Sequence, residues 1–171
     1  RAWSDAGLPL RRIAVNLSAR QFLEGDLPGV VARILAETRC PRDILEFEIT
    51  ESMVMDDPER AALLMQEIRR MGVKVAIDDF GTGYSSLGAL KSFPIDNLKV
   101  DRSFIQDIPG NRDAAAITRA VIVMAHSLDM KVIAEGVETR EQYEFLRAHA
   151  CDEMQGYFFS KPVAEEELLA L

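Results

Sequence analysis

Five short segments of this chain share one feature: each is hydrophobic and β-like and ends on a carboxylate, an amide or a lysine, and residues 153–155 look like a sixth. The five are residues 13–16, 45–48, 75–79, 97–101 and 132–135. In a parallel barrel the carboxyl ends of the strands form the functional face. The segments therefore predict a parallel sheet with a site at one end of its strands.

Helical patterns separate these segments and strengthen that prediction. Asp57 followed by Pro58 and Glu59 is an N-terminal helix signal, and Thr139 with Gln142 is a capping-box pair. The helices are expected at 27–39, 57–71, around 87–91, 113–128, from 139 and from about 164. Alternating strands and helices are typical of a parallel sheet with right-handed crossovers.

The polar strand ends recur at intervals of 20 to 36 residues, which is room for one helix and two loops. Six such units fit in the chain, whereas a closed (β/α)₈ barrel needs eight strands and typically about 250 residues. Residues 1–12 resemble the tail of a helix. We therefore expect an α/β fold, a TIM-like barrel with about six of its eight strands in this chain.

Charge and composition limit the possible functions. The 171 residues are 48% hydrophobic, enough for one core, and carry a net charge of −8 with a pI near 4.8. No basic stripe is available for the phosphates of a nucleic-acid polymer. The longest apolar run, around 120–125, is too short to cross a bilayer. Cys40 and Cys151 are expected to be reduced thiols, as is typical of a cytoplasmic chain. The chain is therefore expected in the cytoplasm, and a membrane anchor elsewhere in the parent protein would be compatible with this location.

The strand-end residues suggest metal chemistry. Glu48 should face the site from its strand, Glu51 should lie on the following loop, and Asp78 and Asp79 are adjacent at the next strand end. Each acid alone would be a surface or capping carboxylate, but their joint placement favours a site. Oxygen ligands without thiolates indicate Mg²⁺ or Mn²⁺. Two such ions could clamp a phosphodiester, with Lys99 adding positive charge near the phosphate or the attacking water.

At these residues the chain resembles the EAL-domain family of bacterial cyclic-di-GMP (c-di-GMP) phosphodiesterases. The matching motifs keep the family's order and spacing over essentially the whole chain. They are Asn16-Leu17-Ser18, Glu48-Ile49-Thr50-Glu51, Asp78-Asp79-Phe80-Gly81, Lys99-Val100-Asp101, Glu135-Gly136-Val137-Glu138, Gln155-Gly156-Tyr157 and Ser160-Lys161-Pro162.

The resemblance implies that the parent protein cleaves one phosphodiester of c-di-GMP to linear pGpG with two divalent cations. It implies metal ligation by five residues, of which Glu135 also has a catalytic role, and catalytic or supporting roles for three more. The metal residues are Asn16, Glu48, Asp78, Asp79 and Glu135, and the others are Lys99, Gln155 and Glu51. Of these, Lys99 and Gln155 would order the water and Glu51 would anchor the 79–85 loop. A homodimer and regulatory domains in the parent protein are also expected.

One departure from the family pattern bears on activity. The Glu-Ala-Leu signature, whose Glu is a metal ligand in the family, has no counterpart in the chain and would precede Arg1. Residues 1–171 are therefore expected to be the C-terminal three-quarters of one EAL-type domain, inactive when isolated. The alternatives are a catalytically inactive c-di-GMP receptor and an interaction domain.

Overall fold

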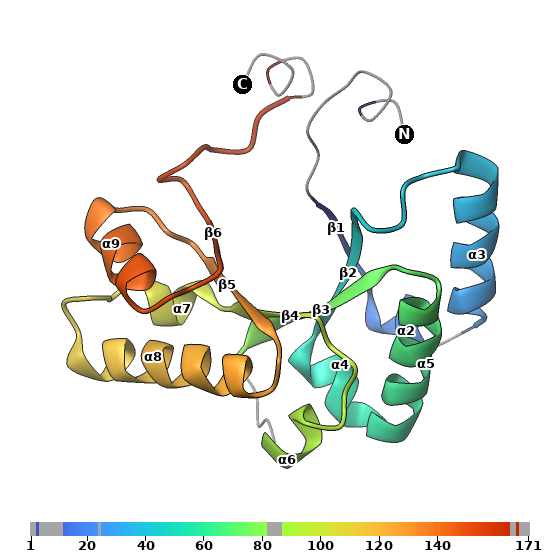
Figure 1. Ribbon diagram of the computed structural model, residues 1–171, viewed down its shortest axis with the longest axis horizontal. Coiled ribbons are helices and arrows are strands. Elements are labelled where there is room, and N and C mark those ends of the chain that lie inside the picture. Colours follow the sequence, from blue (N-terminus) through green and yellow to red (C-terminus); the bar gives the residue numbers. More distant parts are fainter. Residues whose placement is uncertain (1–2, 4–11, 24, 82–86, 165–166, 168–171) are drawn as a thin grey trace. The chain divides into compact units, whose positions relative to one another are not determined.

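The computed structural model describes residues 3, 12–23, 25–81, 87–164 and 167. The chain forms two compact units, residues 1–97 and 98–171. In chain order, six strands alternate with helices (Figure 1).

Three parallel strands form the sheet of the first unit: β1 (Ile13–Asn16), β2 (Leu45–Thr50) and β3 (Lys74–Phe80), in that order. Asn16 is in register with Glu48, and Glu48 with Ala76. Both faces of β2 are buried: Glu46 on one face is 0% exposed and Ile49 on the other is 1% exposed. This is the pattern of a parallel strand covered on both sides.

Among the described residues, these strands are accompanied by α2 (Ala19–Leu23), α3 (Leu27–Thr38), α4 (Glu51–Asp56), α5 (Pro58–Arg70) and α6 (Leu87–Leu90). Asp57 caps α5 by accepting a hydrogen bond from the Arg60 N–H at 3.2 Å. The apolar face of α5 buries Met65 and Ile68 next to β3, and α3 packs beside α5 (Figure 1).

The second unit starts within β4 (Asn97–Val100), whose first residue belongs to the first unit. It continues with α7 (Arg102–Ile105), α8 (Arg112–Ser127), β5 (Lys131–Glu135), α9 (Arg140–Ala148) and β6 (Glu153–Gln155). β5 and β6 are parallel neighbours, and α8 packs against β5 (Figure 1). Ile122, Ile133 and Leu146 form the centre of this unit's core, each at most 1% exposed.

Most predicted elements are confirmed. The helices expected at 27–39, 57–71 and 113–128 are α3, α5 and α8, and the capping box of Thr139 and Gln142 opens α9. The prediction that Glu51 lies on a loop is wrong, because Glu51 is the first residue of α4. The helix expected from residue 164 and most of residues 1–12 lie outside the described residues.

The structure also bears on the membrane and thiol predictions. In the described part of the chain, no helix is long and apolar enough to cross a membrane. Both cysteines are free thiols. Burial raises the pKa of the Cys151 thiol to about 11, which keeps it protonated at neutral pH.

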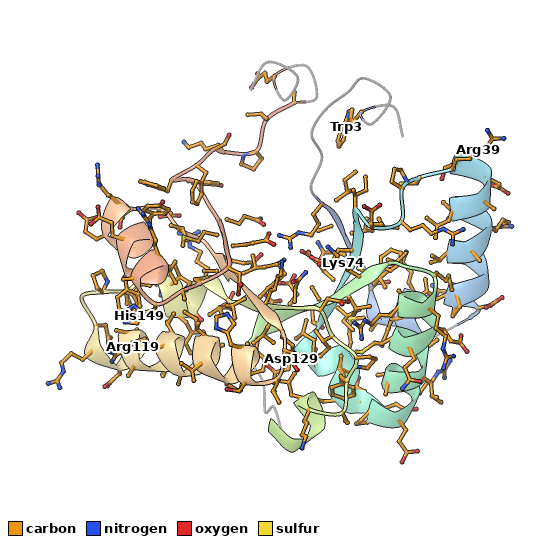
Figure 2. All side chains as sticks on the ribbon, in the orientation of Figure 1. Trp3, Arg39, Lys74, Arg119, Asp129 and His149 are labelled. Atoms are coloured by element: carbon orange, nitrogen blue, oxygen red, sulfur yellow. The ribbon has the colours of Figure 1, made fainter. Side chains whose placement is uncertain are left out.

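The turn after α9 provides a stability prediction. Ala150, next to His149 at the end of α9 (Figure 2), has a left-handed backbone with φ of 60°. A left-handed conformation is strained for alanine but not for glycine. Ala150→Gly should raise the free energy of unfolding by about 0.5–1 kcal/mol in urea denaturation. The matched variant Ala120→Gly, on the exposed side of α8, should lower it by about 1 kcal/mol. Equal signs for the two variants would contradict the prediction.

Candidate active site

The strand register of the first unit places three predicted metal residues on one face of its sheet. Asn16 and Glu48 are direct partners across β1 and β2. Asp78 follows two residues after Ala76, the β3 partner of Glu48. Because side chains alternate along a strand, Asn16, Glu48 and Asp78 point to the same side. Asn16 is exposed, whereas Glu48 is 6% and Asp78 9% exposed.

Asp78 and Asp79 are adjacent, so ordinary alternation would turn their side chains to opposite faces. Asp79 instead has a φ of 55°, a left-handed conformation that aspartate adopts more readily than most residues. Carboxylate oxygens of the two residues consequently lie within 4.8 Å of each other. The Asp79 N–H also donates to Asp78 Oδ1 at 3.0 Å. The chain thus gathers two carboxylates at one strand end.

Glu51 holds the segment that leaves β3. Its Oε2 accepts a hydrogen bond from the Gly81 N–H at 2.9 Å. The side chain is 2% exposed, and its second oxygen, Oε1, accepts no hydrogen bond from the described residues. A buried carboxylate is costly unless it is paired or hydrogen-bonded, so this contact fixes Gly81 relative to α4.

In the second unit, the corresponding strand ends bring together the other predicted residues. Lys99 Nζ lies 2.7 Å from Glu135 Oε1, with the two side chains 5% and 19% exposed. Glu135 is in register with Gln155 on β6, so these two side chains face the same way. Lys99, Glu135 and Gln155 therefore share one end of the second unit's strands.

A further charged pair at this end was not predicted from the sequence. Arg102 Nη2 lies 2.8 Å from Glu138 Oε1, and the Arg102 side chain passes over Gly136, where a Cβ would collide with it. Gly136 has a φ of 70°, which also favours glycine. No local spacing signals this pair, because its members are 36 residues apart.

The neighbouring Asp101 has a structural role. It caps α7 by accepting a hydrogen bond from the Ser103 N–H at 3.0 Å. Partial burial opposes its ionisation, but hydrogen bonds from the Ser103 side chain and from the N–H groups of Ser103 and Arg102 outweigh it and lower the pKa of this carboxyl.

The donor set of the first unit fits a hard divalent cation. One amide and two carboxylates converge from neighbouring strands, and the adjacent Asp79 adds a third carboxylate. All are oxygen donors, the ligands that Mg²⁺, Mn²⁺ and Ca²⁺ prefer, and no thiol lies among them.

Comparison with known proteins identifies the family. A family model described as the EAL domain matches residues 1–162. The chain belongs to the EAL-domain family. The c-di-GMP phosphodiesterase NbdA of Pseudomonas aeruginosa is 44% identical to the EAL chain over 167 residues, 96% of this chain and 21% of NbdA.

Solved structures confirm the fold of the EAL chain. The structure of PaMucR phosphodiesterase, a c-di-GMP complex, is 41% identical with a TM-score of 0.92, over 98% of this chain and 68% of that one. The calcium/c-di-GMP complex of Klebsiella pneumoniae BlrP1 is 32% identical with a TM-score of 0.84, over 94% of this chain and 41% of that one. The EAL chain therefore has the fold of an incomplete TIM-like (β/α)₈ barrel, with six strands among the residues that the structure describes. It spans 25% of the length of the curated P. aeruginosa MucR.

Proposed function

We propose that the EAL chain is the C-terminal three-quarters of a domain that hydrolyses one phosphodiester of c-di-GMP to linear pGpG. The observation that carries this proposal is the strand register that turns Asn16, Glu48 and Asp78 to one face of the sheet. Support comes from the c-di-GMP phosphodiesterases among its relatives, NbdA and PaMucR.

In this proposal the oxygen donors of the strand ends hold two divalent cations, Mg²⁺ or Mn²⁺. Asn16, Glu48 and Asp78 would hold one, and Asp78, Asp79 and Glu135 the other. When bound, the cations supply Lewis-acid charge at the phosphate. The calcium in the BlrP1 complex supports a divalent cation in this family.

Residues of the chain itself position the reactants. Lys99, fixed by its contact with Glu135, and Gln155, in register with Glu135, would orient the hydrolytic water toward the phosphorus. Glu51 would keep the segment from Asp79 onward in place through Gly81. Asp79 would thereby stay beside Asp78 during catalysis.

The test is hydrolysis by the full-length protein with Mg²⁺ or Mn²⁺, before and after chelation with EDTA. We expect a linear dinucleotide, heavier than c-di-GMP by one water in mass spectrometry, and no product after chelation. Excess metal should restore the activity. Binding of c-di-GMP without any product would contradict the proposal and identify a receptor instead.

A further inference from the structure

A hollow in the second unit lies just beyond Gln155. It has a volume of about 380 Å³ and opens at the C-terminal end of β6. Its polar and aromatic lining comes from Gln155, Tyr157, Ser160 and Lys161, and Pro162 also lines it. Because Gln155 is proposed to orient the hydrolytic water, this hollow would be adjacent to the reacting phosphate.

The segment that lines this hollow is anchored to the rest of the unit. The Phe158 N–H donates to the Val137 carbonyl at 3.0 Å. The rings of Phe158 and Phe159 pack on Tyr143 of α9, at centroid distances of 5.4 and 6.1 Å. A Cβ on Gly156 would collide with the Val137 backbone, so the chain passes close to the segment that follows β5. The segment is therefore held in place before any ligand binds.

Lys161 differs from the other cations at this end of the strands. Lys99 and Arg102 each pair with a carboxylate. Lys161 Nζ instead lies 5.7 Å from the ring centroid of Tyr157, and it forms no ion pair with the described residues. Its charge is exposed, held over an aromatic face, and available to an anionic ligand.

We propose that Lys161, supported by Tyr157, binds the second, non-scissile phosphate of the cyclic dinucleotide. This inference rests on the proposed function. The ring of c-di-GMP closes through two phosphodiesters, so when one lies at the reacting position the other is only one nucleoside away. A lysine is a point charge suited to a phosphate oxygen and demands little angular precision. A substrate with a single phosphodiester has no second phosphate for Lys161 to bind.

The test compares c-di-GMP with bis(p-nitrophenyl) phosphate, which has a single phosphodiester, on the full-length protein. Lys161→Met should raise KM for c-di-GMP roughly tenfold and leave kcat within about twofold, because the lost contact serves ground state and transition state alike. The kinetics with bis(p-nitrophenyl) phosphate should not change. Lys161→Arg, which keeps the charge, should retain KM within about threefold of wild type.

Two further measurements separate binding from turnover. Lys131→Met is the matched control, because it also removes an exposed lysine. Lys131 is the first residue of β5 and lies at the opposite end of the strands, so KM for c-di-GMP should not change. Calorimetric binding of c-di-GMP in calcium should weaken roughly tenfold in Lys161→Met, whether or not the protein turns over. The proposed role of Lys161 would be overturned if Lys161→Met left both Kd and KM for c-di-GMP unchanged. It would also be overturned if the variant lost activity equally with c-di-GMP and with bis(p-nitrophenyl) phosphate. Normal binding with no product from wild type would instead overturn the proposed hydrolysis.

Discussion

Glu48→Gln is expected to abolish hydrolysis of c-di-GMP by the full-length protein. The substitution keeps the size and strand position of Glu48 but replaces a buried carboxylate by a weakly coordinating amide. Residues that merely support a metal ligand typically cost 10–100-fold when mutated, so the loss of kcat here should exceed roughly 100-fold. Initial rates at saturating c-di-GMP and Mn²⁺ measure it.

A thermal measurement gives the same prediction a second readout. A cation that binds only the folded protein raises its Tm. Mn²⁺ should raise the Tm of wild type and raise that of Glu48→Gln much less. The control Glu59→Gln, in the exposed first turn of α5, should match wild type in kcat and in the metal-induced Tm shift. Undiminished activity in Glu48→Gln would remove Glu48 from the proposed metal ligands.

Lys99→Met should damage both stability and activity. Lys99 and Glu135 form a largely buried ion pair, and removal of one partner leaves a carboxylate with less compensating charge. Breaking such a pair costs about 3–5 kcal/mol in the free energy of unfolding. Urea denaturation measures that loss, and hydrolysis of c-di-GMP should fall to background.

A second substitution separates the two effects of Lys99. The double variant Lys99→Met/Glu135→Gln has a neutral glutamine where the single variant has an uncompensated carboxylate. Much of the lost free energy of unfolding should therefore return. Hydrolysis should not return, because the Lys99 charge that orients water is missing and Glu135, a proposed metal ligand, has lost its carboxylate. Recovery of activity together with stability would show that Lys99 acts only on the fold.

The sequence predicted the elements that carry strong local signals. Asp57 with Pro58 marks the start of α5, and Thr139 with Gln142 marks the start of α9, because capping groups leave a local signature. Three short helices were missed: α2, α4 and α7. They have four to six residues, too few for an amphipathic period to show. From the sequence, Asp101 was identified only as part of the Lys99-Val100-Asp101 motif, and its role as the cap of α7 was not predicted.

Sequence patterns predicted only part of the candidate site. Asn16, Glu48 and Asp78 could be placed on one face because strand alternation is a local rule. The positive φ of Asp79 has no spacing signal in the sequence, and the contact between Arg102 and Glu138 joins residues that are 36 positions apart. The ligand roles of all these residues stay predictions for the experiments above.

The backbone at Asp79 suggests how to turn the domain into a biosensor. Asparagine tolerates a positive φ much as aspartate does, whereas β-branched residues do not. An Asp79→Asn protein would keep the chain path into Gly81 while losing one negative charge. Such a protein would be a starting point for a reagent that reports the messenger without consuming it.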